Sequence, residues 1–213
     1  MWRWRAFLTT QVIWVAPACA LLLGYLLGSI PFGVLLTRWG GAGDLRQVGS
    51  GNIGATNVLR TGRKGLAAAT LLLDALKGVA AVLLVAHLSP GDELTAAAAA
   101  FLGHCYPVWL RFRGGKGVAT LGGIALALCW PAGLIYAGVW VALLGLLRIS
   151  SLAGMVAALS APVSAALLGR FDLVLLFLSL ALILLWKHRD NIERLLAGTE
   201  PRIGGRGEPR DTG

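Results

Sequence analysis

Apolar residues run along most of this chain in long, nearly uninterrupted segments, separated by short segments rich in glycine and basic residues. An α-helix needs about 20 mostly apolar residues to cross the hydrocarbon core of a bilayer. Six segments approach or exceed that length: Val12–Leu36, Leu66–His87, Leu94–Leu110, Val118–Leu147, Leu152–Leu168 and Phe171–Trp186. The pattern therefore predicts membrane-spanning helices.

The run Val118–Leu147 is too long for one untilted crossing, and Cys129-Trp130-Pro131 interrupts it. Proline has no N–H to donate within a helix, so this run is predicted to form two short helices. We therefore expect about seven transmembrane helices in one polytopic unit over residues 1–198, followed by a disordered tail over residues 199–213. Seven crossings with the N-terminus outside put most lysines and arginines, and the C-terminus, in the cytoplasm, as the positive-inside rule requires.

Composition supports an all-α integral membrane protein. Of 213 residues, 57% are hydrophobic and only 14% are charged, with a mean hydropathy of +0.74. This excludes an ordinary soluble domain and intrinsic disorder. The net charge of +9 is typical of some nucleic-acid-binding proteins, but such domains lack membrane-length apolar runs, so no nucleic-acid partner is expected.

The first of three polar segments is Gly49–Arg60. Its glycines fit G-x-G-x-x-G, but no strand precedes them, so the dinucleotide interpretation fails. Free N–H groups before a helix still favour an anion. Ser50, Asn52 and Asn57 would add neutral donors, and Arg60 would add a guanidinium suited to phosphate. A flexible loop with capping residues is the alternative.

The second segment, Arg111–Thr120, contains Lys116 among glycines but is not a Walker A motif, because Gly117 stands where Ser or Thr is needed. The third, Lys187–Arg194, places two candidates, His188 and Asn191, on one helical face. Taken singly, these segments could be a positive-inside anchor and a basic juxtamembrane turn.

Together the three segments meet one membrane face, where they predict a site for more than one phosphate beside apolar helices suited to a lipid tail. Few carboxylates lie near them, so we expect no metal and no paired-carboxylate catalysis. A membrane transporter of a phosphorylated metabolite is the alternative function, although it would require polar residues along the spans. A membrane scaffold without chemistry is a weaker alternative.

Three motifs resemble those of the bacterial acyl-phosphate:glycerol-3-phosphate acyltransferases, the PlsY family. They are Ser50-Gly-Asn-Ile-Gly-Ala-Thr-Asn57, Gly114-Gly-Lys-Gly-Val-Ala-Thr120 and His188-Arg-Asp-Asn-Ile-Glu-Arg-Leu195. Shorter matches at Gly28–Gly33, Asp74–Gly78 and Gly103–Val108 extend the resemblance over about Leu27 to Leu196.

The resemblance implies seven helices with cytoplasmic motif loops in the bacterial plasma (inner) membrane. It implies acyl transfer from acyl phosphate to the 1-position of glycerol 3-phosphate, giving 1-acylglycerol 3-phosphate and phosphate, the first membrane step of phospholipid synthesis. No cofactor or metal is implied, and acyl-CoA and acyl carrier protein are not direct donors. The soluble enzyme that makes acyl phosphate would be a functional partner.

The resemblance assigns site residues to this sequence by their positions in the motifs. Lys64 and Ser151 lie near the positions where the family has further contacts to phosphate. The implied catalytic residues are Ser50, Arg60, Lys116, His188 and Asn191, and the implied substrate-binding residues are Gly51, Asn52, Asn57, Lys64, Gly114, Gly115, Gly117, Thr120 and Ser151.

Three points stay open on the residues alone. The attacking hydroxyl could lose its proton to His188 or to a phosphate oxygen of the acyl donor, and we favour the phosphate, with His188 positioning a substrate. Ser50 could act as a covalent nucleophile, but no Asp-oriented His is evident beside it. Asp74 and Lys77, three residues apart within a span, are expected to form a structural ion pair.

Overall fold

The computed structural model describes residues 2–204, with side chains from Trp14 onward, and over this part of the chain all regular structure is helical. The α-helices are α1 (Trp2–Gly28), α2 (Phe32–Trp39), α3 (Ala55–Leu59), α4 (Lys64–Leu88), α5 (Glu93–Cys105), α6 (Val118–Leu128), α7 (Trp130–Leu147), α8 (Ser150–Leu167), α9 (Phe171–Lys187) and α10 (Arg189–Leu196); the 3₁₀ turns are η1 (Leu45–Gln47) and η2 (Val108–Leu110).

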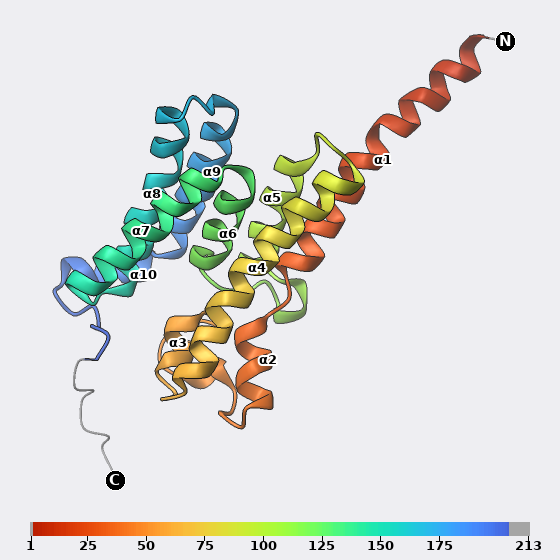
Figure 1. Cartoon of the computed structure of the whole chain (residues 1–213). Coiled ribbons are helices and arrows are strands. Elements are labelled where there is room, and N and C mark those ends of the chain that lie inside the picture. Colours follow the sequence, from red (N-terminus) through yellow and green to blue (C-terminus); the bar gives the residue numbers. More distant parts are fainter. Residues whose placement is uncertain (1, 205–213) are drawn as a thin grey trace.

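The helices form two groups that meet along α6 (Figure 1). In one group α5 packs against α1 and α4, and α4 packs in turn against α6. In the other, α8 lies between α7 and α9. The short helices α2 and α3 lie at one end of the bundle, the end toward which the C-terminal segment also leads (Figure 1). This end carries the polar segments.

Small residues let the long helices approach closely. A Cβ added at Gly24 or Gly28 of α1 would overlap the backbone of α5 at Ala96 or Ala100. A Cβ at Gly123 of α6 would likewise overlap the backbone of α4. Such glycine contacts are the usual means of helix association inside a bilayer, where lipid is as apolar as the helix surface.

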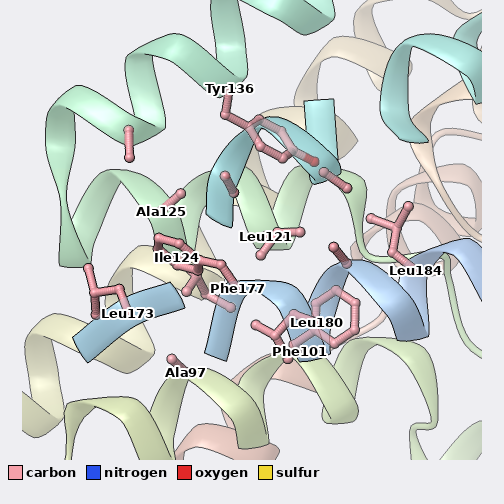
Figure 2. Close-up of a cluster of buried hydrophobic side chains, with 14 of the residues drawn as sticks. Ala97, Phe101, Leu121, Ile124, Ala125, Tyr136, Leu173, Phe177, Leu180 and Leu184 are labelled. Atoms are coloured by element: carbon pink, nitrogen blue, oxygen red, sulfur yellow. The ribbon is translucent and has the colours of Figure 1, made fainter. Parts of the chain in front are cut away.

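The largest apolar cluster fills the junction between the two groups (Figure 2). Phe101 of α5, Ile124 of α6 and Phe177 of α9 are completely buried within it. Many leucines on the outer surface are, by contrast, strongly exposed, including Leu167 at 84% and Leu175 at 74%. A bundle that is apolar both inside and outside is typical of an integral membrane protein.

The predicted break in Val118–Leu147 is confirmed, since α6 ends at Leu128 and α7 begins at Trp130. The run Val12–Leu36 contains a short break between α1 and α2, where Pro31 has no N–H to donate, but Trp14–Trp39 still forms one apolar segment long enough to cross a membrane. One other expected helix was too long. The expected helix Leu94–Leu110 ends at Cys105, two residues before Pro107, which disfavours helix in the residue preceding it.

Within the described residues, length and composition identify four helical segments able to cross a membrane, or five if the pair α9 and α10, bent by 62°, is one span. The protein is therefore a multi-pass membrane protein. The topology of seven crossings with an external N-terminus stays a prediction.

Candidate active site

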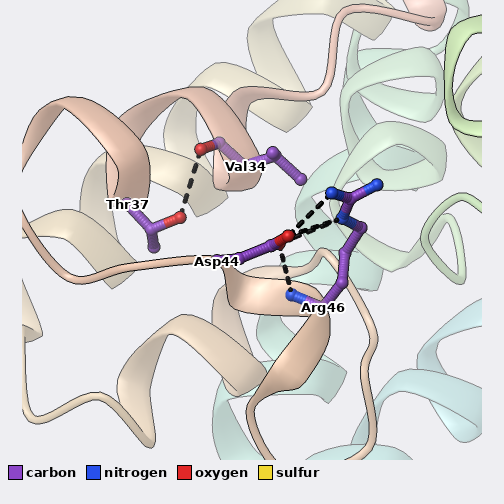
Figure 3. A network of polar contacts seen from close by, with 4 residues as sticks. All are labelled: Val34, Thr37, Asp44 and Arg46. Atoms are coloured by element: carbon purple, nitrogen blue, oxygen red, sulfur yellow. Dashed lines mark hydrogen bonds and ion pairs between the residues drawn. The ribbon is translucent and has the colours of Figure 1, made fainter.

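The first polar segment is held by its own side chains. Asp44 accepts hydrogen bonds from the backbone N–H of Arg46 (3.0 Å) and from its guanidinium (2.7 Å), which caps η1 (Figure 3). These bonds lower the pKa of Asp44 to about 2. In the same view the Thr37 hydroxyl donates to the carbonyl oxygen of Val34 (3.2 Å) within α2. This pair of charges fixes the loop and does not line the cavity described below.

The Asn57 side chain links this segment to the residues just before it. Its side-chain amide donates to the carbonyl oxygens of Leu45 (3.1 Å) and Val48 (2.8 Å), and the residue is buried. Both amide hydrogens are therefore used in holding the loop, and the expected contact of Asn57 to substrate stays a prediction. Ser50 and Arg60 remain exposed on the same loop.

The glycines of the second segment also have a structural role. The N–H groups of Gly114 and Gly115 donate to the end of α5, at Cys105 (3.2 Å) and His104 (3.0 Å). A Cβ at Gly115 would overlap the His104 ring. Gly117 has a φ of +87°, and a Cβ there would overlap the fully buried ring of Phe101 on α5. The N–H groups of Gly114 and Gly115 are thus paired with α5, and the expected phosphate cradle at these two glycines stays a prediction.

This packing places Lys116 at the start of α6. Its ammonium donates to Oδ1 of Asn191 on α10, 75 residues further along the chain. Burial lowers the pKa of Lys116 to about 8, and the nearby Arg194 guanidinium acts in the same direction. The ammonium is therefore a cation at neutral pH that can lose its proton in mildly alkaline solution.

His188 occupies the bend between α9 and α10, just beyond the last residue of α9. Its Nδ1 lies 2.8 Å from the carbonyl oxygen of Leu184. A carbonyl can only accept, so Nδ1 carries the hydrogen and Nε2 carries the lone pair. Burial lowers the pKa of His188 to about 4, so the imidazole is neutral at physiological pH.

Glu200 brings a carboxylate into the same region. It accepts hydrogen bonds from the Ser151 hydroxyl (2.6 Å), the Asn191 amide (2.6 Å) and the Arg194 guanidinium (2.7 Å). Burial alone would raise the pKa of this carboxyl, but the three hydrogen bonds bring it below its usual value. Glu200 lies within the tail expected from residue 199 onward, and Thr199 to Gly204 are among the described residues. Residues 205–213 lie outside the described residues.

These side chains line one cavity of about 810 Å³ between the two groups of helices. It collects nine of the fourteen candidate residues: Ser50, Asn52, Asn57, Arg60, Lys116, Gly117, Ser151, His188 and Asn191.

Five expected site residues are not part of the lining: Gly51, Lys64, Gly114, Gly115 and Thr120. Lys64 is exposed at the first turn of α4. Thr120 is fully buried and donates to the backbone carbonyl of Asp74 (3.0 Å), which ties α6 to α4. Its hydroxyl therefore holds two helices together, and its expected role in binding substrate stays a prediction.

The lining combines cations with an apolar wall. Arg60, Lys116 and Arg194 supply positive charge, while Leu71 and Trp140 belong to the wall along the helices. Such a cavity can hold phosphate groups at one end and an acyl chain at the other. Within residues 2–204, no group of three or more His, Cys, Asp or Glu side chains is placed to hold a metal ion.

Sequence reasoning missed Glu200, because a glutamate in a polar tail carries no pattern. Arg194 follows Asn191 by three residues, so the two share a helical face, and the structure shows that both donate to the Glu200 carboxylate.

Fold and site together define a multi-pass membrane protein with a cavity lined by arginine and lysine side chains at one end of its helical bundle. The family model described as glycerol-3-phosphate acyltransferase matches residues 18–198. The chain is 66% identical to the glycerol-3-phosphate acyltransferase of Novosphingobium aromaticivorans over 186 residues, which cover 87% of this chain and 94% of the relative. It is 58% identical to that of Mesorhizobium japonicum, over 88% of this chain and 96% of the relative.

The structure is also similar to the crystal structure of PlsY, an integral membrane glycerol 3-phosphate acyltransferase, in its glycerol 3-phosphate form. The TM-score is 0.83 at 36% identity, covering 88% of this chain and 96% of that one. The lysophosphatidic acid form of PlsY matches with a TM-score of 0.80 at 33% identity, covering 87% and 94%. The chain belongs to the glycerol-3-phosphate acyltransferase family of the PlsY type.

Proposed function

We propose that this protein transfers an acyl chain from acyl phosphate to the 1-position of glycerol 3-phosphate, releasing 1-acylglycerol 3-phosphate and inorganic phosphate. The observation that carries the proposal is the joining of Arg60, Lys116 and Arg194 with an apolar wall in one cavity. Relatives solved in glycerol 3-phosphate and lysophosphatidic acid forms support the acceptor and the product. Family membership favours this enzyme over a transporter.

Two anionic substrates must approach each other, and their repulsion opposes the reaction unless cations offset it. The exposed Arg60 guanidinium offers a planar pair of donors for a phosphate, and the Lys116 ammonium offers a compact point charge. Burial of Lys116 strengthens its attraction for an anion, because fewer water molecules screen it. In this account the protein contributes proximity and electrostatic stabilisation.

In the transfer step the 1-hydroxyl oxygen of glycerol 3-phosphate attacks the acyl carbon of acyl phosphate. A new ester C–O bond forms, and the C–O bond to phosphate breaks with its electron pair leaving on the phosphate oxygen. The hydroxyl proton moves to an oxygen of the departing phosphate, so charge and atoms balance without any further reactant. Acyl phosphate is a mixed anhydride, so its activation is already present in the substrate.

His188 is assigned to positioning. Its tautomer leaves Nε2 as an acceptor that can orient the substrate hydroxyl, while a pKa near 4 makes the imidazole a weak base. Ser50 lines the cavity without a hydrogen bond to an imidazole among the described residues, which supports a binding role over a covalent one.

We place the cavity at the cytoplasmic face of the bacterial inner membrane, where a soluble enzyme would supply acyl phosphate. The test is a donor comparison in lipid: purified protein receives labelled glycerol 3-phosphate with palmitoyl phosphate, palmitoyl-CoA or palmitoyl-acyl carrier protein. The proposal predicts labelled 1-acylglycerol 3-phosphate from palmitoyl phosphate alone. Equal product from palmitoyl-CoA would contradict the assigned donor.

A further inference from the structure

The Glu200 carboxylate is an unexpected group in a cavity meant for two anions. We propose that Glu200 is a positioning residue, whose carboxylate orients the Asn191 amide and through it directs the Lys116 ammonium toward a substrate phosphate. This inference rests on the proposed function for the identity of the substrates. It gives a role to a segment outside the three sequence motifs.

The orientation of the Asn191 amide is the first argument. Its Nδ2 donates to a Glu200 oxygen (2.6 Å), and a carboxylate can only accept. The amide oxygen must then face the opposite way, toward the Lys116 ammonium that donates to it. The ammonium can only donate, so it also favours the amide oxygen, and the carboxylate adds a second constraint that holds the NH₂ group on the opposite side. Glu200 thus helps to fix which end of Asn191 meets Lys116.

The rigidity of the carboxylate is the second argument. Its side chain is only 7% exposed, and it joins Ser151 at the start of α8 to Arg194 on α10. Three residues later, the N–H of Ile203 donates to the carbonyl of Arg148 at the turn between α7 and α8 (2.7 Å). The segment after α10 is therefore anchored at two points, and it delivers the carboxylate in one place.

Charge is the third argument. Lys116 faces Arg194 and Lys187, which repel its ammonium, and Glu200 and Asp190, which attract it; the neutral His188 also lines the cavity. Among these groups Glu200 alone is hydrogen-bonded to the partner of Lys116. Its carboxylate therefore favours the protonated form of Lys116 and offsets the repulsion from the neighbouring cations.

The test compares wild type with Glu200→Gln, using the full-length protein in lipid. The substitution keeps the shape but replaces one acceptor oxygen by a donor. We expect kcat/KM for acyl transfer to fall by about tenfold or more, the size of effect that follows loss of a charge-assisted hydrogen bond. We also expect the alkaline limb of its pH profile to move to lower pH, because loss of the neighbouring negative charge makes Lys116 easier to deprotonate. A purely structural role would not move this limb.

Glu93→Gln is the matched control, because Glu93 caps the start of α5 through the N–H of Gly91 (3.0 Å) and does not line the cavity. It should keep both kcat/KM and the pH profile. If Glu200→Gln loses its thermal unfolding transition, Glu200→Asp replaces it. That variant keeps the charge on a shorter side chain, so the alkaline limb should stay near wild type while kcat/KM still falls.

Binding of glycerol 3-phosphate, measured by calorimetry, separates this inference from the proposed function. Weaker binding to Glu200→Gln than to wild type supports the positioning role even if wild type does not turn over palmitoyl phosphate, a result that would remove only the proposed donor. Unchanged binding and turnover would overturn the inference. Tighter binding or faster turnover would also overturn it, and would show instead that the carboxylate competes with a substrate phosphate for the same donors.

Discussion

Lys116 is half-buried and His188 is buried, and this burial changes the chemistry of each in a different way. For Lys116 burial lowers the pKa to about 8, which keeps a cation that is poorly screened at neutral pH. For His188 burial lowers the pKa to about 4, which removes the charge altogether. The cavity therefore has one strong cation for phosphate and one neutral acceptor for a hydroxyl.

The pH profile of kcat/KM should show the state of Lys116 in the free enzyme. Below a pH of about 8 the ammonium is protonated and binds anions, and above it the charge is lost, so kcat/KM should fall as the pH rises through this value. The measurement is acyl transfer between pH 6 and 10. In Lys116→Arg, whose guanidinium stays charged, this alkaline limb should disappear; its persistence at the same pH would show that another group titrates.

Replacing His188 by glutamine tests whether it is a base or a positioning residue. Substrate phosphates have a second pKa of about 6 and produce an acid limb of their own. If the proton leaves on phosphate, His188→Gln should lower kcat by about tenfold to a hundredfold, as expected for lost orientation of one group, and should keep the acid limb where it is. Loss of turnover at unchanged substrate affinity, with recovery at raised pH, would identify His188 as the base.

The short elements at the site owe their shape to glycines whose partners the sequence does not reveal. The pattern around Lys116 correctly indicated close approach of the backbone, but it suggested phosphate as the neighbour. The structure shows that the neighbours of Gly115 and Gly117 are His104 and Phe101 of α5. A glycine motif predicts space for a neighbour without saying whether the neighbour is a ligand or a helix.

This distinction predicts the behaviour of Gly117→Ala. The added methyl group meets a buried ring, and alanine disfavours the φ of +87°, so the unfolding free energy should fall by about 1–3 kcal/mol. Gly145→Ala on α7 is the control, because a Cβ there meets nothing within 4 Å. It should unfold at or above the wild-type temperature in a thermal melt in detergent. Equal melting temperatures for both variants would contradict the packing account.

At the scale of the whole molecule, apolar periodicity and proline positions predicted an all-helical membrane protein and the break between α6 and α7. They missed the short break at Pro31 and overestimated helix length near Pro107, since hydrophobic residues such as Val108 and Trp109 continue past the end of the helix. Nine of the fourteen candidate residues share the cavity. The contacts of Glu200 join residues far apart in the chain, so no local pattern could indicate them.

Asp74 and Lys77 form an ion pair on α4, and Lys77 links this pair to the segment between α1 and α2. The ammonium of Lys77 lies 2.7 Å from Asp74 and donates to the carbonyl of Ile30 (2.8 Å), between α1 and α2. Lys77→Met leaves a buried carboxylate without its partner and should lower the unfolding free energy by about 3–5 kcal/mol. The double variant with Asp74→Asn should recover part of this loss in the same thermal melt. A double variant that is less stable than Lys77→Met would exclude a structural ion pair.

If the cavity carries out the proposed reaction, each acyl chain transferred to glycerol 3-phosphate releases one inorganic phosphate. The most direct measurement supplies palmitoyl phosphate and glycerol 3-phosphate to purified protein in lipid and follows phosphate and lysophosphatidate together, with Lys116→Ala alongside. The account predicts equal molar yields of both products from wild type and strongly reduced yields of both from the variant. Phosphate without lysophosphatidate, or equal turnover by Lys116→Ala, would contradict it.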